Sequence, residues 1–104
     1  MRIWTKSRDK ALYEATGEIL DKGRVVVFKG SKINTNPGEK FVLSEELMSK
    51  RNDTAIVSQN GELLIDVSFG SLSTAASFVT GRIANGMIVW KTEDGKYVRY
   101  SIKK

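Results

Sequence analysis

The strongest constraint on the fold is the segment Ser71–Gly81, which has the pattern of a short helix with both ends marked. Ser71 can cap the first turn, and Gly81 can end the helix in a left-handed conformation. The apolar residues between them recur at the helical spacing i, i+3, i+4 and i+7, and they are Leu72, Ala75, Ala76 and Val79. Because alanine side chains are small, we expect this helix to pack closely against a β-sheet.

Two β-hairpins are predicted to supply that sheet. A three-residue loop containing a glycine separates Leu12–Leu20 from the β-branched run Arg24–Phe28. Asp94-Gly95 lies between Met87–Thr92 and Lys96–Ile102, and Asp-Gly is a preferred two-residue hairpin turn. We therefore expect one antiparallel pair before the helix and one after it.

The remaining segments predict a second helix, a loop and a turn. Ser44 precedes two glutamates and then Leu47, which predicts a capped helix that ends near Asp53. Asn34–Lys40 holds the only proline and is predicted to be a loop. Asn60-Gly61 predicts a turn, followed by a strand at Leu63–Ile65.

The predicted fold class is α+β: a small single domain over residues 1–104, with two β-hairpins and two short helices packed on the sheet. A chain of 104 residues with 40% hydrophobic content is enough for one core. The sequence has neither an apolar run of about eighteen residues nor a secretory signal. We therefore expect a cytoplasmic protein with no membrane partner.

The side chains that most enzymes and metal sites depend on are missing from the composition. The chain has no cysteine and no histidine, which removes thiolate nucleophiles, the usual zinc ligands and the common proton-transfer group near neutral pH. Serine chemistry remains only as a remote alternative, because no base is visible beside any serine. We expect no catalytic residue, no metal and no cofactor.

The charge distribution favours a polyanionic partner. The net charge is +5, and no acidic residue lies between Asp66 and Glu93, whereas Arg82 and Lys91 do. The predicted helix in this stretch also starts without an acid, because its first turn offers only Ser71, Ser73 and Thr74. These hydroxyls can cap the helix, and its free N–H groups can also bind phosphate, so both interpretations stay open.

The predicted register of the last hairpin gives it two different faces. A two-residue loop places Trp90 opposite Arg99, with the guanidinium able to lie over the indole. The face expected in the core carries Met87, Val89, Val98, Tyr100 and Ile102; the other carries Ile88, Trp90, Tyr97 and Arg99. An exposed Trp90 would suit base stacking. A core position is the favoured interpretation for Trp90, and a register slip of one residue would exchange the faces.

An ordered set of motifs from about Leu12 onward resembles a known family. The motifs are Val27-Phe28-Lys29-Gly30-Ser31, Phe69-Gly70-Ser71-Leu72-Ser73-Thr74-Ala75-Ala76, Gly81-Arg82-Ile83-Ala84-Asn85-Gly86, Trp90-Lys91 and Asp94-Gly95-Lys96. Together they resemble the small domain of unknown function attached to GIY-YIG nucleases, which is similar to the RAMA (restriction enzyme adenine methylase associated) domain. This chain departs from the family pattern at Leu72, usually proline, and at Met87, usually aromatic.

The resemblance implies an α+β module that accompanies restriction, modification and repair enzymes and contacts DNA, with sensing of modified bases as a further expectation. A nuclease or methylase partner would then be a separate chain. Combined with the charge pattern, this predicts a non-catalytic DNA-binding accessory module. The candidate contacts are Lys29, Ser31, Lys32, Ser71, Ser73, Thr74, Arg82, Asn85 and Lys91. The alternative is a protein-interaction adaptor that docks partners on the last hairpin or on a sheet edge.

Overall fold

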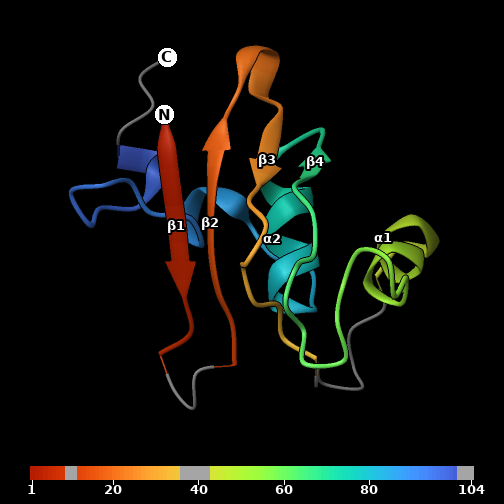
Figure 1. Ribbon diagram of the computed structural model, residues 1–104. Helices are drawn as coiled ribbons and strands as arrows, with labels where there is room; N and C mark the ends of the chain where they lie inside the picture. Colours follow the sequence, from red (N-terminus) through yellow and green to blue (C-terminus); the bar gives the residue numbers. More distant parts are fainter. Residues whose placement is uncertain (9–11, 36–42, 101–104) are drawn as a thin grey trace.

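The computed structural model describes residues 1–8, 12–35 and 43–100, and a four-stranded antiparallel sheet lies at its centre (Figure 1). The strand order is β1-β2-β3-β4, so neighbours in the sheet are also consecutive strands in the chain. The strands are β1 (Arg2–Lys6), β2 (Glu14–Ile19), β3 (Val25–Val27) and β4 (Val67–Phe69). With two α-helices, α1 (Glu45–Arg51) and α2 (Leu72–Thr80), the described chain is a small α+β domain, as predicted.

The first predicted hairpin is confirmed. β2 pairs with β3 antiparallel, with Gly17 opposite Val27, and a short 3-10 turn at Asp21–Gly23 joins the two strands. The turn contains a left-handed residue, Lys22, at φ 63°. Gly17 is required where the strands approach closely, because a Cβ atom there would lie 2.3 Å from the Val26 carbonyl oxygen.

The edge strand β1 was not expected from the sequence. It pairs with β2 from Arg2 opposite Glu18 to Lys6 opposite Glu14. Ile3 and Thr5 are buried on one face, whereas Arg2 and Lys6 are exposed, so this segment does alternate with a period of two. The alternation of apolar and polar residues is hard to recognise in the sequence, because a threonine occupies one of the buried positions.

The strand predicted at Leu63–Ile65 lies instead at β4, a few residues later. Leu63 is buried, but its backbone bonds to the loop after β3: its N–H donates to the Ser31 carbonyl, and its own carbonyl accepts from Gly30 N–H. Because the Leu63 N–H and carbonyl are bonded to this loop, they are not available to pair with a neighbouring strand of the sheet. The turn at Asn60-Gly61 is confirmed, since Gly61 has φ 85° and its N–H donates to the Ser58 carbonyl.

Both predicted helices and their caps are confirmed. In α1, Ser44 Oγ accepts from the Leu47 N–H, and in α2, Ser71 Oγ accepts from the Thr74 N–H. Gly81 ends α2 in the left-handed conformation at φ 82°. α2 packs on β3 and β4, and α1 lies to one side of it (Figure 1).

The core lies between the sheet and α2. The Phe69 and Phe78 ring centroids are 4.9 Å apart there. The largest fully buried side chains around them are Ile3, Val25, Val27, Ile33, Leu63, Val79, Trp90 and Val98. Among the described helices, none is long and apolar enough to cross a membrane.

The last hairpin differs from the prediction in form and in register. In place of two strands the structure has two short 3-10 turns, at Gly86–Ile88 and Val98–Tyr100. Lys91 pairs with Tyr97, and the Thr92 N–H donates to the Lys96 carbonyl, which shifts the register by one residue from the predicted one. The loop is therefore one residue longer than the predicted Asp94-Gly95 turn.

This register decides which side chains are buried. Trp90 is fully buried, which confirms its core interpretation, and its indole Nε1–H donates to the Leu72 carbonyl at 3.1 Å. Val98 packs in the core beside it, and its N–H donates to the Trp90 carbonyl. The predicted core position of Tyr100 is wrong, because that side chain is 69% exposed. Ile102, and residues 36–40 of the predicted loop, lie outside the described residues.

Candidate nucleic-acid interface

A cavity of about 690 Å³ on the described surface lies where β1 ends and the segment after α2 passes it. Four of its described lining residues are cations, and none is Asp or Glu. The cations are Lys6, Arg8, Arg82 and Lys91, and we call this concavity the basic cavity. It also holds two aromatic residues, Tyr13 and Tyr97.

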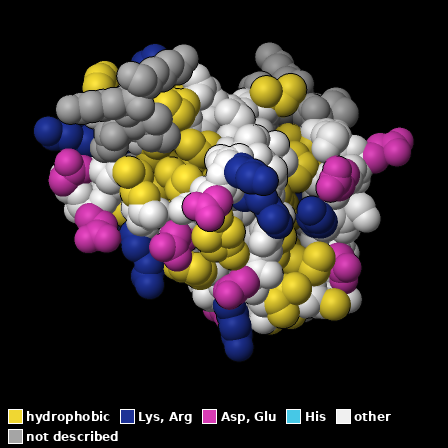
Figure 2. Space-filling model, turned by 90° about the horizontal axis from the view of Figure 1, so that it is seen from above, with side chains coloured by type: hydrophobic (Ala, Val, Ile, Leu, Met, Phe, Trp, Pro, Cys, Tyr) yellow, Lys and Arg dark blue, Asp and Glu magenta, His cyan; other side chains and the backbone are white. Residues whose placement is uncertain are grey.

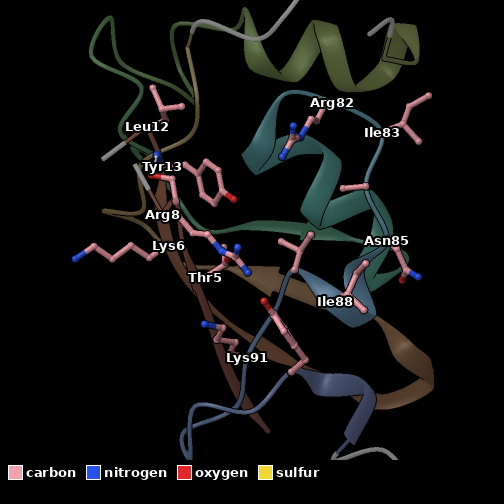
Figure 3. A pocket seen from close by; sticks show the side chains of 14 residues that line it. Thr5, Lys6, Arg8, Leu12, Tyr13, Arg82, Ile83, Asn85, Ile88 and Lys91 are labelled. Carbon is pink, nitrogen blue, oxygen red and sulfur yellow. Dashed lines mark hydrogen bonds between the residues drawn. The ribbon is translucent and has the colours of Figure 1, made fainter. Parts of the chain in front are cut away.

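One wall of the basic cavity is fixed by hydrogen bonds between the end of β1 and the start of β2. The Ser7 N–H donates to the Tyr13 carbonyl at 3.0 Å, and the Tyr13 N–H donates back to Ser7 Oγ at 3.3 Å. These two bonds hold Arg8 and Tyr13 on the same side of the molecule. In Figure 3 the Arg8 guanidinium points into the open space of the cavity, while Lys6 extends away from it.

The opposite wall is built by the turn that leaves α2. Thr80 Oγ1 donates toward the Ala76 and Arg82 carbonyls, and Ser77 Oγ accepts from the Ala84 N–H at 3.1 Å. These side chains fold the segment after Gly81 back over the end of the helix. Arg82 is thereby placed so that its guanidinium points toward the same space as that of Arg8 (Figure 3).

Lys91 is held at the cavity by two aromatic rings. Its backbone pairs with Trp4 through two hydrogen bonds, of 2.9 and 2.7 Å. Its ammonium Nζ lies 5.2 Å from the Trp4 ring centroid and 5.2 Å from that of Tyr97, within the range of cation–π attraction. The sequence prediction that Arg99 lies over Trp90 is wrong, because Trp90 is buried in the core and the aromatic pair instead encloses Lys91.

Asn85 lines the same cavity but has a structural role. Its side-chain Oδ1 accepts from the Met87 N–H at 2.9 Å and so caps the 3-10 turn at Gly86–Ile88. In Figure 3 the side chain points away from the open space between Arg8 and Arg82. The structure therefore brings together Arg82 and Lys91 as charged candidates, with Asn85 as a neighbour that shapes the wall.

The three hydroxyl candidates at the start of α2 are engaged within the fold. Ser71 Oγ caps the helix and lies 2.9 Å from Thr74 Oγ1, while Ser73 Oγ accepts from the Gly86 N–H at 3.0 Å. Gly86 packs directly on this turn, because a Cβ atom there would lie 2.3 Å from the Leu72 carbonyl carbon. The capping interpretation is thus confirmed, and the hydroxyls lie apart from the residues that line the basic cavity.

The other three candidates line a second, smaller cavity of about 360 Å³ at the loop after β3. Ser31 is buried, and its Oγ bonds to both the N–H and the carbonyl of Thr16. Lys29 and Lys32 are exposed, but Glu14 lines the cavity with them, and the Lys29 N–H donates to Asp66 Oδ1 at 2.7 Å. The local charge is therefore mixed, and Ser31 serves the fold.

The end of the molecule that carries the β2–β3 turn also has mixed charge. Figure 2 views this end, and Lys and Arg side chains are interspersed there with Asp and Glu side chains. The basic cavity lies at the other end of the sheet, where β1 ends and β2 begins. A concavity whose described lining carries cations and no carboxylate focuses positive potential more strongly than alternating surface charges do.

No set of three or more His, Cys, Asp or Glu side chains in the described part of the chain could hold a metal ion. The serines discussed above are bonded to backbone groups or to Thr74. The basic cavity thus places cations beside aromatic rings.

Sequence reasoning did not identify Lys6, Arg8 and Tyr13 as site residues. Lys6 and Arg8 were visible as a basic cluster near the N-terminus, and the alternation of Ile3 with Thr5 could have indicated a strand before them. Their proximity to Arg82 and Lys91 was not visible, because it depends on the pairing of Trp4 with Lys91.

Comparison with known proteins gives one match. Residues 6–101 match the family model of a domain of unknown function, DUF4357. No curated protein and no solved structure matches the chain. The matched range includes all four cations and both tyrosines of the basic cavity.

Proposed function

The chain belongs to the DUF4357 family of domains of unknown function, and from this premise we propose that it is a non-catalytic DNA-binding accessory module. The observation that carries the proposal is the basic cavity, whose described lining has four cations and no carboxylate. Phosphate groups would be its ligands, because Arg and Lys supply the charge-assisted hydrogen bonds that phosphate oxygens accept.

The geometry of the cations supports this proposal. Arg8 and Arg82 point into one space from opposite walls (Figure 3), so a phosphate between them would meet two guanidinium groups. Lys91 is oriented by the Trp4 and Tyr97 rings before any ligand arrives, which lowers the entropy cost of ordering it. Lys29 and Lys32 serve as peripheral phosphate contacts in this proposal, as does the start of α2.

The biological setting of the proposal comes from the resemblance to domains that accompany nucleases and methylases. The module would act in the cytoplasm beside such an enzyme on a separate chain, in restriction–modification or repair. Sensing of a modified base would be part of that role. The basic cavity is the part of the described surface where such a contact would be made.

A salt titration of DNA binding tests the proposal. With three or four cations engaged, a plot of log Kd against log salt concentration should have a slope of about 3 to 3.5 for duplex DNA and about 2 to 3 for single strands. Arg82→Ala and Lys91→Met should each weaken binding and reduce that slope by about 1. The matched controls Arg99→Ala and Lys96→Met change exposed cations outside the cavity and should leave both values unchanged. Absence of DNA binding even at low ionic strength would disprove the proposal.

A protein-interaction adaptor is the second candidate function. The burial of Trp90 removes the central side chain of the docking face predicted from sequence. Apolar surface does remain beside the basic cavity, where Ile83 is 72% exposed and Ile88 is 44% exposed. The titration separates the two functions, because an adaptor without nucleic-acid contact shows no DNA binding at any salt concentration.

A further inference from the structure

We infer that the basic cavity receives an unpaired nucleotide, so that the preferred substrate is single-stranded DNA or an extrahelical nucleotide in a duplex. This inference rests on the proposed DNA-binding function and names the substrate class of the same site. Three properties of the cavity carry it: its size and concavity, its aromatic residues, and the placement of its cations.

The size and concavity favour a single nucleotide over a duplex. A volume of about 690 Å³ lies within the range of pockets that enclose small molecules. A protein that reads duplex DNA commonly inserts a protruding helix or ribbon into a groove. Here the cations line a hollow, and β1 and the segment after α2 form its walls (Figure 3). A paired base cannot enter such a hollow without leaving its partner.

The aromatic residues provide a surface for an unpaired base. Tyr13 and Tyr97 both line the cavity and are both partly exposed. Base faces stack on aromatic rings only when they are released from the duplex stack, so aromatic side chains in a basic groove are typical of single-strand binding. In an intact duplex these rings would have no exposed base to contact.

The cations are placed to hold the phosphates on either side of that base. Arg8 and Arg82 come from opposite walls, and Lys91 lies beside Tyr97 with its Nζ 5.2 Å from the ring centroid. A base stacked on Tyr97 would therefore have an ammonium group within reach of its own phosphate. This combination of stacking ring and adjacent cation is what single-stranded nucleic acid requires.

The test compares four ligands by fluorescence anisotropy and competition at one salt concentration. They are a twelve-nucleotide single strand of DNA, a blunt duplex of the same sequence, that duplex with one extra unpaired nucleotide, and the mononucleotide dTMP. We expect the single strand and the bulged duplex to bind at least about fivefold tighter than the blunt duplex, since stacking contributes about 1–3 kcal/mol per base. We expect dTMP to bind more weakly than the single strand.

Each contrary result has a distinct meaning. Equal or tighter binding of the blunt duplex would overturn this inference while leaving the DNA-binding proposal standing. Binding of dTMP as tight as that of the single strand would overturn it in favour of a free-nucleotide site. Failure of every DNA ligand to bind would remove the proposed function itself, and the inference with it.

Tyrosine variants give an independent readout. Tyr97→Leu keeps an apolar side chain but removes the stacking ring, so single-strand affinity should fall about fivefold or more. Blunt-duplex affinity should fall less, because it loses only the orientation of Lys91 by the ring. Tyr100→Leu is the matched control, because Tyr100 is 69% exposed and lies outside the cavity lining. Tyr13→Leu repeats the test on the other wall. Thermal unfolding verifies that each variant is folded, and folded variants with wild-type single-strand affinity would overturn the inference.

Discussion

Asp94 shows at the residue scale how one carboxylate stabilises the last turn. It accepts hydrogen bonds from Thr92 Oγ1 and, at 3.2 Å, from the Lys96 N–H. The Thr92 bond first, and then the Lys96 bond, hold the pKa of Asp94 below its ordinary value. Because the folded pKa is depressed, the stabilisation is present above the unfolded value of about 3.9. It is lost as the pH falls through the depressed pKa of the folded state.

We predict that Thr92→Ala raises the pKa of Asp94 toward its unfolded value. The variant removes the hydroxyl that preferentially stabilises the charged carboxylate, so protonation should occur at a higher pH. An NMR titration of the Asp94 carboxyl carbon measures the shift. Thr54→Ala, at an exposed threonine outside this turn, is the control and should leave the Asp94 titration unchanged. An unchanged pKa of Asp94 in Thr92→Ala would show that the Thr92 hydroxyl does not cause the depression of that pKa.

At the scale of elements, Arg51 connects the two helices. It lies in the last turn of α1 and donates hydrogen bonds to the carbonyls of Phe78 in α2 and Asn34 in the loop after β3. Burial lowers the pKa of the Arg51 guanidinium, but an arginine remains charged at neutral pH. One side chain thus satisfies two backbone acceptors and fixes α1 against the rest of the fold.

Arg51→Ala should lower the free energy of unfolding by about 1.5–3 kcal/mol, the range for hydrogen bonds that involve a charged group. Urea denaturation followed by far-UV circular dichroism measures the change. The control is Arg24→Ala, which truncates an exposed arginine in the β2–β3 connection and should change stability by less than about 0.5 kcal/mol. If both variants lost the same free energy of unfolding, the hydrogen bonds of Arg51 to Phe78 and Asn34 would make no specific contribution to stability.

At the scale of the whole molecule, the segment from Trp90 to Lys91 joins the sheet edge to α2. Lys91 pairs with Trp4 of β1, and the Trp90 indole donates to the Leu72 carbonyl at the start of α2. Neither the edge strand nor this end of the helix can separate without breaking contacts of the same short segment. We therefore expect the sheet and the helix to unfold together.

Single-tryptophan variants test this coupling. In Trp90→Phe the fluorescence reports on Trp4 in β1, and in Trp4→Phe it reports on the buried Trp90. In each variant, the urea midpoint from fluorescence should coincide with the midpoint from far-UV circular dichroism, as in two-state unfolding. Non-coincident midpoints in Trp4→Phe, which keeps the Trp90–Leu72 hydrogen bond, would mean that the sheet and the helix do not unfold together.

The sequence by itself determined the features that depend on neighbours a few positions apart. Ser44 and Ser71 cap helices because each side chain reaches an N–H three residues later. Gly81 ends α2, and a glycine-containing loop turns β2 into β3, because glycine tolerates conformations that other residues resist. The locally positive stretch after Asp66 was likewise visible, and two of its cations do line the basic cavity.

Only the tertiary structure decided β1, the position of β4, the register of the last hairpin and the composition of the cavity. The Asp94-Gly95 pair is compatible with a hairpin loop of two or three residues. In the structure the loop has three residues, and in that register Trp90 and Val98 are both buried. Arg8 and Arg82 are far apart in sequence, and they line the same cavity in a fold where Trp4 pairs with Lys91. Contacts of this kind form when segments far apart in the sequence bury apolar surface against each other. The spacing of residues within one segment does not indicate which distant segment it will pack against.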